Sequence, residues 1–518
     1  MPGASKPLRS DRRKPFEGSK EATGSSLSAE LGLNGGLGSM LLVLAGDSLI
    51  YLVGLAIIGL GNLILVPFFM RYLAPAEFGV YALVDVTIAV LMGLSLLKLD
   101  VSYLKWFAEF DGGQREEMLW SVLLAAALAS GVLGALLALG AASPVGERWL
   151  QTTDRTFAWT LLPVLVLESL QGLLFSDLRA RRRAVAYSVL AALRLFAMLG
   201  ASVWFVAVKK QGLCGFFLGR LTGDAVCVAA LCCLCLSLRR IRFRPAILRP
   251  MLRFGLPLAW AGLMLVMLDA TGRYILSRAS TMEEVGLYGA AIKISSVFQI
   301  LIAQPFGVAW GGLMFQIAPW PNAPMVYSKI LNYVLVLSLT GALVIALFTP
   351  TLFTILASAP YFAAVAVFPL VLLVQAVRVM EYPAAVSIYL AGKTKHFAWI
   401  YTLGLCANVA VNCLLTPAYG MFGAVWAWLV SGIIIIVLTA SLGQRYYALH
   451  YEWKLPLLIM APWVAVLLAR HGFIQALIRF RWPAQAILAL VVLLGGVLLV
   501  LRDVRLTDKA LSSEEASR

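Results

Sequence analysis

Long apolar runs recur along most of this chain, and they restrict the folds open to it more than any other feature. As a helix, about 20 residues cross the ~30 Å hydrocarbon core of a bilayer while satisfying their own backbone hydrogen bonds. The composition agrees, since 61% of the residues are hydrophobic and only 13% are charged, against about 25% charged in soluble proteins. The runs therefore predict an all-α integral membrane protein.

The apolar runs predict fourteen transmembrane helices. No polar linker of the kind that separates soluble domains interrupts the series after residue 40. The expected ranges are 47–70, 77–97, 118–141, 157–176, 184–208, 213–238, 254–277, 284–308, 330–350, 361–390, 397–416, 421–442, 455–469 and 484–501.

The distribution of basic residues predicts the orientation. Residues 1–40 are rich in Ser, Gly, Lys and Arg and lack the apolar segment of a signal peptide. They are expected to form a disordered basic tail that stays in the cytoplasm as an anchor, with partner binding as the alternative. With this end inside, 28 Lys and Arg residues fall in inner segments and 9 in outer loops. Both termini are therefore expected to be cytoplasmic.

The net charge of +16 follows mostly from this topology, and nucleic-acid binding is not implied. Two arginine clusters in the predicted inner segments are suited to anionic membrane lipids. These clusters are Arg179, Arg181, Arg182 and Arg183, and Arg239, Arg240, Arg242 and Arg244.

No cofactor or metal is expected. The seven cysteines fall inside predicted spans without the spacing of a zinc site. Gly392-Lys393-Thr394 resembles the end of an ATP-binding loop, but Ser387 occupies the position that needs the first glycine. Energy is therefore expected from an ion gradient, from downstream consumption of the substrate, or from a partner.

An internal repeat organises the chain. The segment Glu77–Ala82 reads EFGVYA, and Glu284–Gly289 reads EVGLYG 207 residues later. Arg71-Tyr72 and Arg273-Tyr274 lie near the close of the preceding spans. Because six spans separate the copies, both halves share one orientation and form a parallel repeat. We expect a bundle over 41–245, a second over 246–445, and two extra helices with a cytoplasmic tail over 446–518.

Four segments carry a resemblance to a known family. They are 71–81 (RYLAPAEFGVY), Phe254–Leu258 (FGLPL), Asp269–Leu276 with the copy Glu284–Tyr288 and Lys293, and 408–424, where Asn408 and Asn412 precede Pro417, Tyr419, Gly420, Gly423 and Ala424. In order and spacing they resemble polysaccharide flippases of the Wzx and PST type, in the multidrug/oligosaccharidyl-lipid/polysaccharide exporter superfamily. The matches span roughly residues 45–445.

The resemblance implies a flippase of the bacterial inner membrane. Such proteins move a polyprenyl-diphosphate-linked oligosaccharide to the outer leaflet by alternating access, with two six-helix bundles around a central cavity and 12 or 14 spans. The lipid-linked oligosaccharide and the membrane lipids are the expected partners, and whether a polysaccharide polymerase or assembly complex works beside the chain stays open. The physical task is consistent with this, because a glycan and a diphosphate lose water hydrogen bonds in hydrocarbon at several kcal/mol per unpaired group.

Ten ionisable residues lie inside the spans, where a charge needs a functional or structural reason. Three pairs are three or four residues apart on one helix and are expected to pair locally: Arg220 with Asp224, Asp269 with Arg273, and Arg378 with Glu381. The other four are Asp85, Glu168, Arg194 and Lys293.

Arg194 and Lys293 rank first as contacts for the diphosphate, because neither has a partner on its own helix. Lys293 also shares a helical face with Ser296 and Gln304. The alternative is structural pairing with Asp85 or Glu168 from other helices. Arg273, Arg220 and Arg378 complete the predicted cationic set, although Arg273 is also near enough to the outer end to snorkel.

The carboxylates are candidates for ion coupling. A carboxyl group inside the membrane can carry a proton between two access states, and Asp85 and Glu168 are the first candidates. Their alternative role is that of counter-ions. Asp224, Asp269 and Glu381 complete this set, and Gln304, Asn408 and Asn412 are predicted polar cavity residues. For the two asparagines, hydrogen bonding between helices is the favoured alternative.

Two other functions remain open from the sequence. A cation-coupled multidrug antiporter of the same superfamily would present a chiefly acidic cavity, whereas five basic and five acidic residues occupy the spans here. A membrane-embedded glycosyltransferase or polymerase would use similar lipid-linked sugars, yet such enzymes usually carry a sizeable outer loop or domain. The sequence therefore favours a transporter without catalytic residues.

Overall fold

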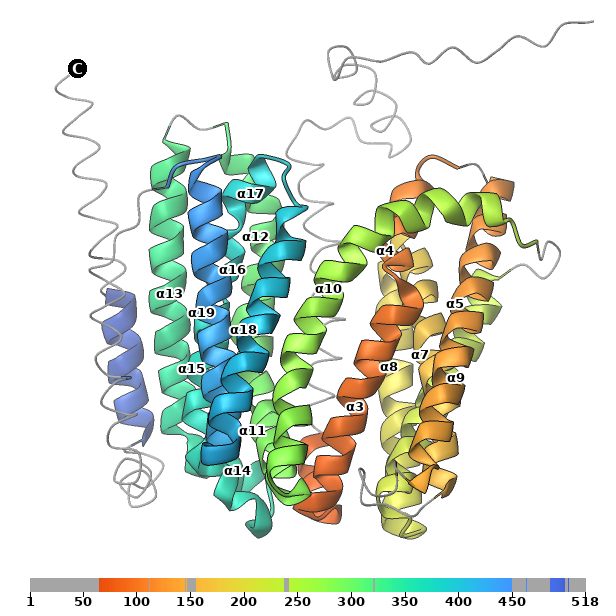
Figure 1. Cartoon of the computed structure of the whole chain (residues 1–518), viewed down its shortest axis with the longest axis horizontal. Helices are drawn as coiled ribbons and strands as arrows, with labels where there is room; N and C mark the ends of the chain where they lie inside the picture. Colours follow the sequence, from red (N-terminus) through yellow and green to blue (C-terminus); the bar gives the residue numbers. More distant parts are fainter. Residues whose placement is uncertain are drawn as a thin grey trace, which may run out of the picture. The chain divides into compact units, whose positions relative to one another are not determined.

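A computed structural model gives the fold of the chain (Figure 1). It describes residues 65–110, 112–144, 146, 155–236, 242–319, 322–449, 463, 485–498 and 502. The elements in the first half are α3 (Pro75–Leu96), α4 (Leu99–Phe107), α5 (Gly112–Ala141), α7 (Arg155–Ala180), α8 (Ala184–Ser202), the π-helix η1 (Val203–Val208) and α9 (Gly212–Cys235). Next comes α10 (Pro245–Ala279). The second half contains α11 (Met282–Phe298), the π-helix η3 (Gln299–Ala303), α12 (Gln304–Ile317), α13 (Ala323–Leu347), α14 (Thr349–Leu356), the 3₁₀-helix η4 (Ala359–Ala366), α15 (Phe368–Arg378), α16 (Glu381–Ala384), α17 (Val386–Leu390), α18 (His396–Tyr419) and α19 (Met421–Gln444).

Eleven helical segments among the described residues are long and apolar enough to cross a membrane, and no strand occurs among those residues. The eleven correspond to the predicted spans from 77–97 through 421–442, which confirms an all-α, multi-pass membrane protein. The basic tail at 1–40 and most of the spans 47–70 and 455–469 lie outside the described residues. The last predicted span contains a shorter apolar helix, Gln485–Leu498. The total of fourteen therefore stays a prediction.

The sequence repeat is also a repeat of packing. Helix α5 packs on α7 as α13 packs on α15, and α8 packs on α9 as α18 packs on α19. Likewise, α7 contacts α9 and α15 contacts α19. Helices α3 and α11, which open the two copies, pack against each other. The domain boundaries near 245 and 445 remain predictions, but the pairing of helices follows the two copies of the motif.

The starts of α3 and α11 fix the register of this repeat. The residue before α3 is Ala74, and the residue before α11 is Thr281, which is 207 positions later. In this register the counterpart of Arg71 is Arg278, and each lies four residues before the first residue of its helix. Arg273, which lies inside α10 six residues before its end, is therefore not the counterpart of Arg71 in the repeat. Its role as a snorkelling residue stays a prediction.

Two glycines bring α3 and α11 into backbone contact at one end of the bundle. A Cβ atom on Gly79 would lie 2.0 Å from the carbonyl oxygen of Met282, and one on Gly286 would lie 1.8 Å from that of Pro75. No side chain fits at either position, so glycine is required for the close approach. The charge count predicts that this end faces outward.

Helix α10 connects the two halves and contacts both. It packs on α3 and α4 from the first half and on α18 and α19 from the second, and Figure 1 shows it running between them. Near its start, Ser102 of α4 donates a hydrogen bond to the carbonyl oxygen of Met251 at 3.0 Å. The α3–α4 turn at Leu97 and Lys98 has positive φ angles of 44° and 58°. This strained turn lies against α10, since a Cβ on Gly255 would meet the Leu97 carbonyl oxygen at 2.5 Å.

Candidate functional site

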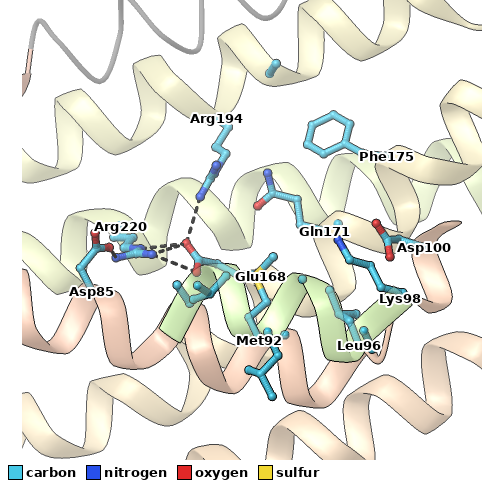
Figure 2. A pocket seen from close by; sticks show the side chains of 18 of the residues that line it. Asp85, Met92, Leu96, Lys98, Asp100, Glu168, Gln171, Phe175, Arg194 and Arg220 are labelled. Atoms are coloured by element: carbon cyan, nitrogen blue, oxygen red, sulfur yellow. Dashed lines mark hydrogen bonds and ion pairs between the residues drawn. The ribbon is translucent and has the colours of Figure 1, made fainter. Parts of the chain in front are cut away.

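A cavity of about 590 Å³ lies between α3, α7, α8, α9 and α10. Its lining includes four of the ten ionisable residues singled out from the sequence, namely Asp85, Glu168, Arg194 and Arg220. Figure 2 shows these four side chains gathered at one part of the cavity, with Lys98, Asp100 and Gln171 farther along it. Charged groups from four different helices therefore meet at membrane depth.

Arg220 is the centre of this group. Its Nε and Nη2 atoms donate to the two carboxylate oxygens of Glu168 at 2.8 and 2.9 Å, and its Nη1 donates to Asp85 at 2.8 Å. The bidentate geometry is the strongest form of a guanidinium–carboxylate contact. The side chains of Arg220 and Glu168 are only 12% and 10% exposed, so little solvent screens the pair.

Arg194 extends the same group. It donates to Asp224 at 2.6 Å through Nε and to Glu168 at 3.2 Å through Nη2. The Asp224 side chain is fully buried, and its second carboxylate oxygen has no hydrogen-bond partner among the described residues. Glu168 thus bridges both arginines. Three carboxylates face two guanidiniums, and we call these five residues, Asp85, Glu168, Arg194, Arg220 and Asp224, the ion cluster.

The ion cluster corrects the predicted local pairing. Arg220 pairs with residues of α3 and α7 rather than with Asp224, and Asp224 pairs with Arg194 of α8. Arg194 is therefore paired with a carboxylate from another helix, which was its alternative role, and Glu168 is its counter-ion. Spacing along one helix did not predict these partners. Residues on other helices lie closer to the side chains of Arg220 and Asp224 than these two residues lie to each other. Among the described residues, no group of three or more His, Cys, Asp or Glu side chains is placed to hold a metal ion.

The remainder of the first cavity contains polar residues that the sequence analysis did not select. Lys98, in the strained turn after α3, and Asp100 line it together with Gln171. Gln171 is 5% exposed, and its side-chain oxygen finds no partner in the described part of the chain. Just beyond the cavity, Tyr103 of α4 donates to Asp177 at 2.7 Å. Burial and the Asp177 carboxylate raise the pKa of Tyr103 above its ordinary value, so this tyrosine stays protonated as a donor.

A second cavity of about 730 Å³ lies among α10, α11, η3, α12, α15, α16, α18 and α19. Arg378 of α15 donates to Asp269 of α10 at 2.8 Å, and Tyr401 of α18 donates to Glu381. These contacts again replace the predicted local pairs, Arg378 with Glu381 and Asp269 with Arg273. Arg273 also lines this cavity, and its buried Nε has no hydrogen-bond partner among the described residues.

The second cavity also contains aromatic and amide side chains. Gln304, predicted as a cavity residue, lines it. The amides of Gln299 and Gln375, which hydrogen-bond to each other, were not foreseen. The repeat register was the missed signal, because Gln375 lies 207 residues after Glu168, and Arg378 lies 207 residues after Gln171. Corresponding positions of the two halves therefore line two different cavities. The aromatic lining residues are Tyr288, Trp310, Tyr382, Tyr389, Tyr401 and Trp428.

Lys293 lies outside both cavity linings. Its ammonium nitrogen is 3.4 Å from the hydroxyl oxygen of Tyr81 and 5.8 Å from the centre of that ring. It therefore joins α11 to α3, close to the glycine contact of these helices. The predicted polar face is divided, since Gln304 reaches the second cavity beyond the π-helical turn and Lys293 does not.

Asn408 and Asn412 pack between helices. Asn408 donates to Ser431 at 3.0 Å and to the carbonyl oxygen of Ala427 at 3.3 Å, both on α19. Asn412 donates to the side-chain oxygen of Asn408 and accepts from Thr416 at 2.9 Å. Both asparagines are buried, and neither is in the lining of the two cavities described above. These contacts favour the packing alternative over the predicted cavity role.

Comparison with known families identifies the group to which the chain belongs. The profile of the family described as "Polysaccharide biosynthesis protein" matches residues 43–317, more than half of the sequence. The chain is a member of this family of membrane proteins. A comparison with curated protein sequences finds no match.

Solved structures show the same fold. The lipid II flippase MurJ in an inward closed conformation aligns with a TM-score of 0.70 at 13% identity, over 88% of this chain and 99% of that chain. An inward-facing multidrug resistance MATE family transporter of the MOP superfamily aligns with a TM-score of 0.62 at 14% identity, over 75% of this chain and 97% of that chain. A MATE structure in a straight conformation aligns with a TM-score of 0.54 at 15% identity, over 77% of this chain and 94% of that chain. The chain therefore has the fold of these MurJ and MATE structures.

Proposed function

We propose that this protein is a flippase that moves a polyprenyl-diphosphate-linked oligosaccharide across the cytoplasmic membrane for polysaccharide synthesis. The observation that carries the proposal is the pair of polar cavities on either side of α10, inside helices that are otherwise apolar. Membership of a polysaccharide biosynthesis family supports a sugar-bearing substrate. Such a head group needs a hydrogen-bonding path through hydrocarbon, whereas the polyprenyl tail does not.

Arg273 becomes the first candidate for the diphosphate. Arg194 and Arg220 are already matched by three carboxylates in the ion cluster, and Lys293 contacts Tyr81. Arg273 lines the larger cavity with an unpartnered guanidinium Nε, and Arg378 lines the same cavity. A guanidinium binds phosphate oxygens in the same forked geometry as a carboxylate. Arg273 therefore takes the place that Arg194 and Lys293 held among the predicted contacts, and Arg378, which is paired with Asp269, lies in the same lining.

The tight contact of α3 with α11 supports transport by alternating access. The glycine contact closes the end that the charge count assigns to the outside, so the cavities would be entered from the cytoplasmic end in this state. Movement to the outward state requires this contact to separate. The ion cluster has one more carboxylate than guanidiniums, and Asp224 carries an unpartnered buried oxygen. It is the candidate site for the coupling ion.

A transport assay tests the flippase proposal. Proteoliposomes would contain wild type, Arg273→Gln, or the control Arg249→Gln at an exposed position near the start of α10. Flipping of a fluorescent polyprenyl-diphosphate oligosaccharide would be followed with and without an imposed proton or sodium gradient. We expect transport by wild type and the control and a loss of at least about tenfold in Arg273→Gln, as for one charged hydrogen-bonded contact. No flipping by wild type under any gradient would refute the proposal.

A cation-coupled multidrug antiporter is the second candidate, favoured by the excess carboxylate of the ion cluster. The same proteoliposomes distinguish it. An antiporter would move a hydrophobic cation against an opposing ion gradient, leave the lipid-linked glycan in place, and lose this activity in Glu168→Gln.

A further inference from the structure

The second cavity contains a set of neutral hydrogen-bonding groups that the diphosphate does not use. Its charged side chains are balanced, with Arg273 and Arg378 facing Asp269 and Glu381. With the diphosphate assigned to Arg273, the uncharged part of the lining decides what else this cavity binds. That lining consists mainly of amides and aromatic rings.

A π-helical turn brings two of these amides to the same wall. Five residues along an α-helix would separate Gln299 and Gln304 by about 140° around the axis. Residues Gln299–Ala303 instead form a π-helix, and the backbone N–H of Gln304 donates to the carbonyl oxygen of Gln299. Such single-turn insertions are frequent at functional sites. Here the turn directs both amides into the second cavity, whose lining includes both.

Two buried donor atoms of residues that line the second cavity have no hydrogen-bond partner among the described residues. The Trp428 side chain is 94% buried, yet its indole Nε1 makes no hydrogen bond there. The guanidinium of Arg378 lies 5.3 Å from the Trp428 ring centre, so the ring is packed while its N–H is unused. The other donor is Arg273 Nε. A buried indole N–H normally has a partner, which points to a ligand acceptor.

Aromatic ring faces complete the lining. Tyr382 and Tyr389 are 44% and 41% exposed despite their place in the cavity wall. Tyr382 packs its ring edge over Gly307, where a Cβ would lie 3.0 Å from the ring carbon bearing the hydroxyl. The cavity volume is within the range of roughly 300–1,000 Å³ common for small-molecule sites. Ring faces with amides and an N–H donor suit a neutral, hydroxylated ring.

We propose that the second cavity binds a sugar ring of the substrate, through Gln299, Gln304 and Trp428 Nε1 with Tyr382 and Tyr389 as apolar walls. This inference rests on the proposed flippase function, in which Arg273 holds the diphosphate. The first cavity lacks a comparable set and carries the ion cluster instead. The two halves thereby have different roles: the second half binds the sugar, and the first half contains the candidate site for the coupling ion.

Equilibrium binding to purified protein in lipid nanodiscs tests the sugar site. The probes are polyprenyl-diphosphate oligosaccharides extracted from the producing cells, and polyprenyl diphosphate without sugar. We expect wild type to bind the sugar-bearing probe more tightly. Trp428→Phe, which keeps an aromatic ring but removes the indole N–H together with part of the ring volume, and Gln304→Leu should each weaken binding of that probe about fivefold, as for one ordinary hydrogen bond. Binding of the sugar-free probe should not change.

Two further variants separate the outcomes. Trp399→Phe, at a 72% exposed position outside both cavities, is the matched control and should bind both probes as wild type does. Arg273→Gln should weaken both probes equally. Equal affinity of wild type for the two probes overturns the sugar site and leaves the flippase proposal intact. Unchanged binding of both probes by Arg273→Gln contradicts the diphosphate assignment instead. Tetraphenylphosphonium, a hydrophobic cation, is a third probe. If wild type binds it and Trp428→Phe does not, the second cavity binds a cation, and the proposal of a neutral ligand is overturned.

Discussion

At the residue scale, the ion cluster consists of ion pairs that join different helices. Glu168 accepts from Arg220 and Arg194, and Arg220 also reaches Asp85, so no charge in the cluster has only a local partner. Removing one member of a buried ion pair leaves the other desolvated and unmatched, which costs more than the pair contributes. The packing of α3, α7, α8 and α9 therefore depends on the cluster being complete, and the cluster is also the candidate ion site.

Arg220→Met should destabilise the protein strongly. Loss of the guanidinium leaves Glu168 and Asp85 without their nearest cation, with an expected cost of about 3–5 kcal/mol. Thermal unfolding of purified protein would measure it. Adding Glu168→Gln should recover part of the loss, because one unpaired charge is removed as well. A double variant no more stable than Arg220→Met would contradict this account of the cluster.

The sequence indicated which charges were important but not which partners they would find. Arg220 and Asp85 are 135 residues apart, and Arg378 and Asp269 are 109 apart. Helical periodicity reports only on neighbours three or four positions away, so it proposed local pairs. The partner of each arginine is decided by how helices pack, which one sequence does not specify. The unused signal was the register of the repeat, which relates Glu168 to Gln375.

At the element scale, each half contains a glutamate that lies beside a glycine with positive φ at the start of another helix, but the two glutamates make different contacts. Glu77 of α3 lies beside Gly212, where α9 begins with a φ of 51°, and Glu284 of α11 lies beside Gly420, before α19, with a φ of 55°. Within the part of the chain that the structure describes, Glu77 accepts only from the backbone N–H of Ala74 at the start of its own helix. Glu284 accepts from the N–H of Met421 at 2.7 Å, and so it caps α19 and ties it to α11.

Glu284→Ala should therefore cost more stability than Glu77→Ala. Loss of a helix cap is worth about 0.5–2 kcal/mol, and Glu284 in addition bonds Ser280. Thermal unfolding of the two variants side by side provides the comparison, and Glu77→Ala is the matched control for loss of a motif glutamate. Equal melting temperatures would show that the α11–α19 contact adds nothing.

Gly286→Ala should loosen the contact of α3 with α11. The added Cβ would overlap the Pro75 carbonyl oxygen, so the helices must move apart at a cost of about 1–3 kcal/mol. Spin labels at Ala76 and Glu283, both exposed, would be placed in a variant without the seven native cysteines. Their separation should increase in Gly286→Ala. It should stay unchanged in Gly200→Ala, where nothing lies within 4 Å of the added atom.

At the scale of the whole molecule, the apolar runs and the repeated motif predicted the class of fold correctly. Hydrophobic length determines which segments span the membrane, and these spans agree with the described helices from α3 through α19. The presence of two separate cavities could not be predicted in this way. It arises because α10 contacts both halves, with Val266 facing the first cavity and Leu265 the second. A change that moves α10 would affect both.

Alternating access predicts that the protein cannot transport while the α3–α11 end is locked. Ala76 and Glu283 are adjacent to the residues that form the glycine contact, so a short flexible bis-maleimide should join cysteines at these positions. Cross-linked Ala76→Cys/Glu283→Cys protein should stop flipping the lipid-linked oligosaccharide but still bind it. Each single-cysteine variant treated with the same reagent should flip normally. Transport that continues at the wild-type rate in fully cross-linked protein would mean that this end does not open, and that the substrate leaves by a route other than the one between α3 and α11.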